Sequence, residues 1–193
     1  KLLIITYIYI MNKMKVYAEG VARAWPVIII IVPFLSYFLT NDIDLLLLSA
    51  MITLVDKFIT PFLKNYIFKN LMGTKNYPIL GIGKRPKGAK DTGCFLTKKN
   101  EISNTYGMPS GHATSAWFFS IYTINVILNS SMNQITKILG AFLFIGLGVG
   151  IMYSRVKFRC HTIQQVILGG IFGSIFGKLY YDNKNTIKNF LNI

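Results

Sequence analysis

The sequence contains few of the residues that hold metals or cross-link a chain. Its 193 residues include 7 Asp and Glu, 2 His and 2 Cys. Two imidazoles exclude a metal site built on several histidines, and so few carboxylates leave little for carboxylate-bound Mg²⁺. Two cysteines cannot form a disulfide framework. We therefore expect neither a metal nor a cofactor.

Apolar and basic residues are what the sequence has in excess. Hydrophobic residues make up 52% of the chain, and its 21 Lys and Arg give a net charge of +14. This is too apolar for a disordered basic tail and too basic for an ordinary soluble enzyme. The composition predicts an integral membrane protein that handles an anionic molecule. A nucleic-acid partner, which the charge alone would suggest, does not fit the apolar segments.

Five apolar segments predict an all-α, polytopic membrane helix bundle. Backbone groups in lipid must be hydrogen-bonded internally, so each segment of roughly 20 residues is expected to be a helix. The segments cover about residues 21–40, 43–68, 113–128, 138–153 and 163–181.

The two ends of the chain lie outside the five apolar segments. We expect one domain over residues 21–181, a segment of uncertain status over 1–20 and a polar tail over 182–193. The apolar run at residues 1–10 is too short to span a bilayer. It is the end of a truncated helix, a signal-like stretch or upstream sequence, and the residues leave these alternatives open.

The connections between the segments predict where the polar motifs gather. The long polar loop of residues 70–109 and the short basic loop of 155–160 are separated by two helices. They therefore lie at the same membrane face, and the hairpins at 41–44 and 129–136 lie at the other.

Two histidines stand at the start of apolar segments on that shared face. His112 ends the run YGMPSGH, and His161 ends the run SRVKFRCH. One imidazole could attack the phosphorus of a bound phosphoryl group while the other protonates the leaving oxygen. The residues alone do not say which imidazole has which role.

Groups suited to phosphate lie next to both histidines. Ser110 is expected to cap the helix that follows it, and the free N–H groups of the first turn, with Gly111 beside them, form an anion site. Arg85 and Arg155 can each bind two phosphate oxygens. Such a set would hold a phosphoryl group without a metal.

Three segments together resemble a known signature. Arg85-Pro86, the run PSGH ending at His112, and Ser154-Arg155-x5-His161 resemble the three motifs of the type 2 phosphatidic acid phosphatase (PAP2) superfamily. The resemblance covers about residues 43–181. It implies a bundle of usually six helices, against five counted here, so a first helix is expected to be missing or truncated.

The resemblance also implies the role of each motif residue. His161 would be the nucleophile that forms a phosphohistidine, and His112 would be the general acid. The phosphate-binding positions of the three motifs match Arg85, Ser110, Gly111 and Arg155.

The first departure from the family concerns a lysine seven residues before the motif arginine, where this chain has Pro78. We expect Lys64, at the end of the second apolar segment, to take its place. Lys69 is the second choice and Lys84 the third. Each could instead be an ordinary interfacial lysine whose ammonium extends toward water.

The second departure is Gln165, where most members of the family have Asp. An amide oxygen can accept from the imidazole N–H of His161 and fix its tautomer, but it cannot stabilise an imidazolium as a carboxylate would. Dolichyl diphosphatases resemble this chain here and in the runs YGMPS, WFF and HTxxQV. They usually have Ser where this chain has Gly111.

The resemblance implies a lipid phosphate or diphosphate substrate, with a polyprenyl diphosphate as the leading expectation. A phosphatidate or other lipid monophosphate phosphatase, a lipid phosphotransferase and an inactive membrane scaffold remain alternatives. The resemblance also implies the endoplasmic reticulum membrane and a lumenal or extracytoplasmic catalytic face. The oligomeric state stays open.

Two residue pairs have structural interpretations. Asp56, inside the second segment, is expected to pair with Lys57 or with a lysine of the site rather than to catalyse. Cys94 and Cys160 share the predicted catalytic face and could bridge if that face is lumenal. Two free thiols are the favoured interpretation.

Overall fold

The computed structural model describes residues 2–95, 101–103 and 105–193, and over these the chain is mostly helical. The predicted all-α class is confirmed, with one small two-stranded antiparallel hairpin added. The elements in order are α1 (Leu2–Thr40), α2 (Ile43–Leu54), η1 (Val55–Ile59), α3 (Thr60–Phe62), η2 (Leu63–Phe68), α4 (Lys69–Met72), β1 (Asn76–Tyr77), β2 (Gly81–Ile82), α5 (Asp91–Cys94), α6 (Gly111–Leu128), α7 (Gln134–Lys157) and α8 (Ile163–Leu191).

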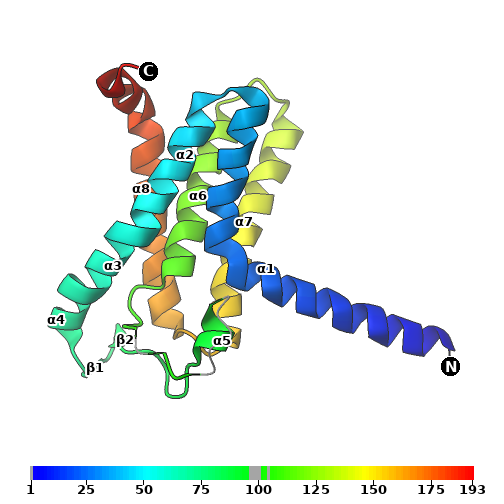
Figure 1. The fold of residues 1–193 in the computed structure, drawn as a ribbon, viewed down its shortest axis with the longest axis vertical. Helices are drawn as coiled ribbons and strands as arrows, with labels where there is room; N and C mark the ends of the chain where they lie inside the picture. The colour runs from blue at the N-terminus through cyan, green and yellow to red at the C-terminus, as the bar shows by residue number, and fades with distance from the viewer. Residues whose placement is uncertain (1, 96–100, 104) are drawn as a thin grey trace.

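The helices cover all five predicted apolar segments and extend beyond several of them. The second segment is one continuous rod from α2 to α4, in which η1 and η2 are π-helical turns. α1 reaches back to Leu2, and its N-terminal part projects away from the bundle (Figure 1). α8 continues through most of the residues expected to form a polar tail.

The outer surface of the bundle is that of an integral membrane protein. Among the described helices, three stretches are long and apolar enough to cross a membrane: Tyr9–Thr40, Ile43–Met72 and Gln134–Lys157. Large apolar side chains such as Phe38, Phe142 and Leu143 point outward from them. Lipid tails are the medium that suits such a surface.

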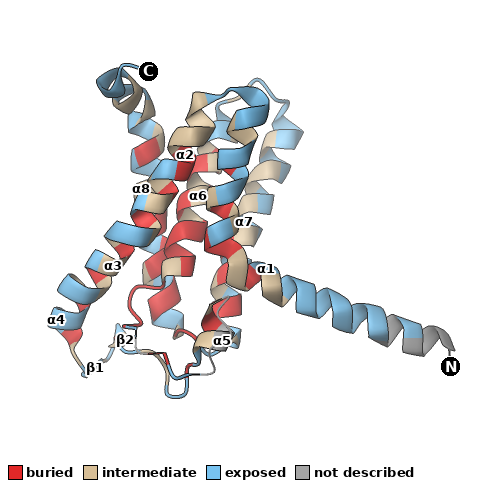
Figure 2. Ribbon diagram, viewed as in Figure 1, coloured by how far each residue is buried: buried red, intermediate tan, exposed pale blue. Residues whose placement is uncertain are grey.

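α6 lies at the centre of the bundle and carries buried polar residues. Nine of its 18 residues are buried, and several are small polar residues such as Thr114, Ser115 and Ser120 (Figure 2). The surrounding helices shield α6 from lipid, so its hydroxyls can bond within the helix, as Thr114 does to the Ser110 carbonyl.

Glycines of α8 bring its backbone close to that of α6, as small residues do in membrane bundles. A Cβ added at Gly173 would lie 2.2 Å from the Thr114 carbonyl oxygen, and one at Gly177 would lie 2.5 Å from that of Phe118. The same contact continues to the end of α6, where the Ser110 N–H donates to the Gln165 carbonyl. The packing therefore holds the second motif against the third.

All three motifs gather at one end of the bundle, as the count of crossings predicts. In Figure 1 the strands, α5, the start of α6 and the connection from α7 to α8 lie at one end. The hairpins between α1 and α2 and between α6 and α7 lie at the other.

A disulfide ties this end together, so the expectation of two free thiols is wrong. Cys94 at the end of α5 is bonded to Cys160, with their Cα atoms 5.4 Å apart. The two residues are 66 positions apart in the sequence, and the residues around each cysteine do not mark the two as partners. The bond fixes the long loop next to His161.

Candidate active site

A cavity of about 1200 Å³ opens at the end where the motifs meet. Of the residues predicted for the site, five line it: Lys64, Arg85, Gly111, His112 and His161. The other three, Ser110, Arg155 and Gln165, are fully buried next to that lining. The fold therefore brings together all eight predicted residues, from five separate parts of the chain.

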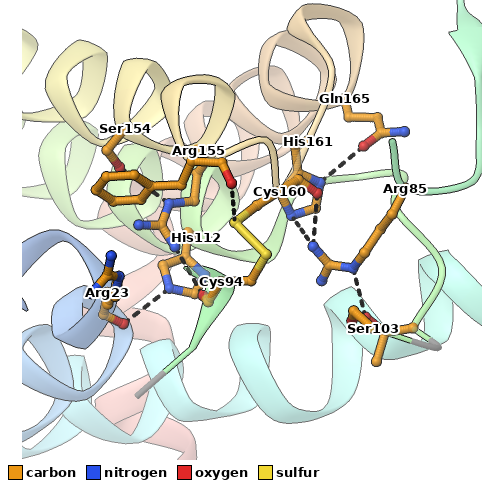
Figure 3. Close-up of a disulfide and its surroundings, with 12 residues drawn as sticks. Arg23, Arg85, Cys94, Ser103, His112, Ser154, Arg155, Cys160, His161 and Gln165 are labelled. Carbon is orange, nitrogen blue, oxygen red and sulfur yellow. Dashed lines mark hydrogen bonds between the residues drawn. A yellow bond between two sulfur atoms is a disulfide. The ribbon is translucent and has the colours of Figure 1, made fainter. Parts of the chain in front are cut away.

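His161 is held in one tautomer by Gln165. The Gln165 Nε2 atom donates to the carbonyl oxygens of Ile82 and Lys84, each at 2.8 Å. This turns the amide oxygen toward the ring, where it lies 3.0 Å from His161 Nδ1 (Figure 3). Because an amide oxygen only accepts, Nδ1 carries the hydrogen, and Nε2 keeps its lone pair.

Arg85 faces that lone pair. Its Nη1 atom lies 3.1 Å from His161 Nε2 and also donates to the Cys160 carbonyl oxygen at 2.9 Å. Its Nε atom donates to the Thr105 hydroxyl at 2.8 Å. Burial lowers the pKa of Arg85 to about 10, which still leaves it a cation at neutral pH. The arginine thus places a positive charge at the potentially nucleophilic nitrogen.

The surroundings of His161 keep it unprotonated. The side chain is 4% exposed, and its burial, together with the charges of Arg85 and Lys64, holds its pKa well below 6.5. Protonating a buried imidazole beside two cations costs free energy in two ways, through lost hydration of the new charge and through repulsion by the cations. At neutral pH Nε2 therefore carries no proton and keeps the lone pair that a nucleophile needs, here accepting from Arg85.

His112, the second residue of α6, occupies the other side of the site. Its Nε2 atom lies 3.2 Å from the carbonyl oxygen of Arg23 on α1. A carbonyl can only accept, so Nε2 carries a hydrogen and Nδ1 is the nitrogen available for proton transfer. The ring lies against Phe95, with centroids 6.2 Å apart.

Ser110 is the N-cap residue of α6, but the predicted capping hydrogen bond is absent. The residue is tied through its backbone to Gln165 instead, and its buried hydroxyl has no hydrogen-bond partner among the described residues. Buried polar groups are normally paired. The hydroxyl is therefore free to bond an anion at the start of the helix.

Arg155 is completely buried and braces the disulfide region. Its Nη1 donates to the Cys94 carbonyl oxygen at 3.0 Å, and its Nε donates to the Ser154 hydroxyl at 3.1 Å. The third nitrogen, Nη2, is buried without a partner in the described part of the chain. Like the Ser110 hydroxyl, it is a donor that a phosphoryl oxygen would satisfy.

Three lysines were candidates for the missing lysine of the first motif, and all three line the cavity: Lys64, Lys69 and Lys84. The charge of Lys64, the first choice, contributes to the low pKa of His161. It lies in η2, and the β1–β2 hairpin separates it from Arg85 along the chain. Asp56 pairs with Lys57 at 2.8 Å, as expected.

Sequence reasoning missed Arg23, which also lines the cavity. It stands in the first apolar segment, and a charge inside such a segment is costly enough to mark a functional position. That signal was present in the sequence. Its spatial partner, His112, is 89 residues away and could not be read from it.

The comparisons with known proteins place this chain in a family. Residues 45–188 match the model of the PAP2 superfamily, and the chain belongs to that superfamily. This confirms the membership that the three motifs indicated.

Curated relatives match a shorter stretch. Lipid phosphate phosphatase epsilon 2, chloroplastic, of Arabidopsis thaliana is 33% identical over 82 residues, which is 42% of this chain and 28% of that protein. Dolichyldiphosphatase 1 of Dictyostelium discoideum is 36% identical over 81 residues, 40% of this chain and 35% of that protein. Dolichyldiphosphatase 1 of Homo sapiens is 31% identical over 88 residues, 42% and 37% respectively. The chain thus covers about a third of each relative. No solved structure matches it.

Proposed function

We propose that this protein hydrolyses a lipid phosphate or diphosphate, with a polyprenyl diphosphate as the preferred substrate, and needs no metal. The observation that carries the proposal is the chain Gln165–His161–Arg85, in which an unprotonated Nε2 faces an arginine at 3.1 Å. The membership in the PAP2 superfamily and the relatives named dolichyldiphosphatase 1 and lipid phosphate phosphatase support the same conclusion.

The reaction has two steps. His161 Nε2 attacks the terminal phosphorus and the bond from phosphorus to the leaving oxygen breaks. His112, which enters this step as an imidazolium, gives its Nδ1 proton to that oxygen. Water then attacks the phosphorus of the phosphohistidine and gives a proton to His112 Nδ1. The bond from phosphorus to His161 Nε2 breaks, its electron pair returns to Nε2, and inorganic phosphate leaves. Charge on the transferred phosphoryl group is stabilised by fixed donors: Lys64, Arg85, Ser110, the Gly111 N–H and Arg155.

The lipid part of the substrate would lie among the helices with its headgroup in the cavity. We infer that the protein resides in the endoplasmic reticulum membrane with this face toward the lumen. The Cys94–Cys160 disulfide supports that orientation, because disulfides persist in the lumen and are rare in the cytosol. The relatives named lipid phosphate phosphatase support a lipid monophosphate as the second candidate substrate.

The test is phosphate release by the purified protein in detergent with EDTA. The substrates are a polyprenyl diphosphate, a phosphatidic acid and glucose 6-phosphate, and His161→Ala is the control. We expect release from the polyprenyl diphosphate and loss of at least about 10³-fold in the variant, as for removal of a nucleophile. Preference for phosphatidic acid would replace the substrate but keep the mechanism. No release from any substrate by folded protein would contradict the enzyme assignment and favour a membrane scaffold.

A further inference from the structure

The cavity has an arginine residue in contact with each histidine, through the guanidinium of Arg85 and through the backbone carbonyl of Arg23. Arg85 contacts His161, and Arg23 contacts His112. In Figure 3 Arg23 lies beyond His112 on the side away from His161 and Arg85. In this view the order across the site is therefore Arg85, His161, His112 and Arg23.

The side chain of Arg23 has little to hold it within the protein. Its ion pair with Glu19, one turn earlier on α1, is 3.6 Å long and about 30% exposed, and such pairs contribute little. The guanidinium lies over the Phe158 ring at 4.9 Å. Its Nε atom is buried and has no hydrogen-bond partner among the described residues. A charged donor left in this state is suited to an anionic ligand in the cavity it lines.

The proposed reaction puts such an anion next to His112. In-line attack by His161 directs the leaving oxygen away from the nucleophile, toward the acid. With a diphosphate, that oxygen belongs to a second phosphoryl group. With a monophosphate, it belongs to a lipid alcohol and carries no further phosphate.

We propose that Arg23 binds the second phosphoryl group of a diphosphate and so selects diphosphates over monophosphates. This rests on the proposed function. When the bond between terminal phosphorus and bridging oxygen breaks, the bridging oxygen keeps the electron pair, receives the proton of His112 and leaves on a lipid monophosphate. Arg23 holds that monophosphate through two oxygens, as a guanidinium fork does.

The variant Arg23→Gln tests this without disturbing the acid, because the Arg23 backbone carbonyl that holds His112 is retained. We measure kcat/KM for a polyprenyl diphosphate and for the monophosphate of the same chain. The ratio of the two is expected to fall by about 10- to 100-fold, the size of a lost charged hydrogen-bond pair. Arg23→Lys should keep part of it. Glu19→Gln, which breaks the ion pair but keeps Arg23, is the matched control and should leave the ratio unchanged.

A binding measurement separates this proposal from the proposed function. Two ligands are titrated into wild type and Arg23→Gln. One is methylenediphosphonate, which the enzyme cannot cleave at the bridging position, and the other is methylphosphonate, which has a single phosphonate group. Selective weakening of the diphosphonate supports the subsite even if the wild type releases no phosphate. An equal weakening of both ligands, or no change in either ligand or in the kinetic ratio, would overturn it.

Discussion

Gln165 joins His161, the proposed nucleophile, to the loop that carries Arg85. Its amide oxygen accepts from His161, and its amide nitrogen donates to the carbonyls of Ile82 and Lys84. A carboxylate could do the first but not the second. This gives a physical reason for an amide at a position where the family mostly has Asp.

Gln165→Glu should therefore damage both the loop and the reaction. The new carboxylate faces two carbonyl oxygens with no hydrogen to give, and we expect a loss of about 1–3 kcal/mol in stability. The negative charge also raises the pKa of His161, so the acid limb of the pH profile of kcat/KM moves to higher pH. Thermal unfolding in detergent and a pH–rate profile measure the two effects. An unchanged acid limb would show that Gln165 does not act on the imidazole.

The low pKa of His161 predicts a pH dependence of stability. In the unfolded chain the imidazole takes up a proton as pH falls through 6.5, whereas the buried ring does so only well below that value. The unfolded state then binds more protons, and stability present above pH 6.5 is lost as pH falls. His161→Asn keeps a donor toward Gln165 but does not titrate. Its midpoint of thermal unfolding should fall less between pH 7.5 and pH 5 than that of the wild type, and an equal fall would refute the low pKa.

Motif residues could be predicted from the sequence because their spacing along the chain is itself the signal. This spacing was enough to predict four residues of the site: His112, His161, Arg85 and Arg155. Ser110 was predicted for the site as well, but the capping bond expected of its hydroxyl is absent, and its backbone N–H donates to Gln165 of α8 instead. Arg23 was missed because it belongs to none of the three motifs, although a charge inside an apolar segment is itself a signal.

The contact between α6 and α8 is the element on which the site depends, because α6 carries His112 and α8 carries Gln165. Gly173→Ala would place a Cβ 2.2 Å from the Thr114 carbonyl oxygen, and backbone on both sides leaves it nowhere to go. We expect a loss of about 3 kcal/mol in stability and a matching loss of activity, since overpacking separates the two helices.

Gly150→Ala in α7 is the matched control. A Cβ there meets nothing within 4 Å among the described atoms. Alanine favours helix over glycine by about 1 kcal/mol, so this variant should be neutral or slightly more stable. Thermal unfolding of the two variants in the same detergent provides the comparison. Equal stability of both would mean that the close approach of α6 and α8 is not required.

Hydropathy predicted the positions of the helices better than their ends. The ends of α1 and α8 lie outside the five apolar segments, because extending a helix that already exists adds one hydrogen bond per residue without a new nucleation step. The π-helical turns η1 and η2 and the β1–β2 hairpin carry no strong signal in the residues. η2 carries Lys64, and the hairpin lies between Lys64 and Arg85 in the sequence, so neither feature of the first motif could be predicted from its spacing.

At the scale of the whole molecule, counting helices was enough to gather the motifs at one end. It could not say which side of the membrane that end faces. The lysines that would mark a cytoplasmic loop are the same residues that a phosphate site needs, so the positive-inside rule gives no answer here. The disulfide supplies a separate argument for orientation, since it depends on the redox state of the compartment.

The disulfide should also be required for a working site. It joins two residues whose backbone carbonyls hold the motif arginines. The Cys94 carbonyl accepts from Arg155, and the Cys160 carbonyl accepts from Arg85. Reduction frees the loop across 66 residues, and we expect a loss of about 2–4 kcal/mol in stability together with reduced phosphate release. The Cys94→Ser/Cys160→Ser double variant should show the same loss and no further response to reductant. In membranes from cells, a thiol-reactive polymer should label the wild type only after reduction. Labelling without reductant would show that the bond does not form in the cell. Full activity of the reduced protein would show that the bond does not position the arginines.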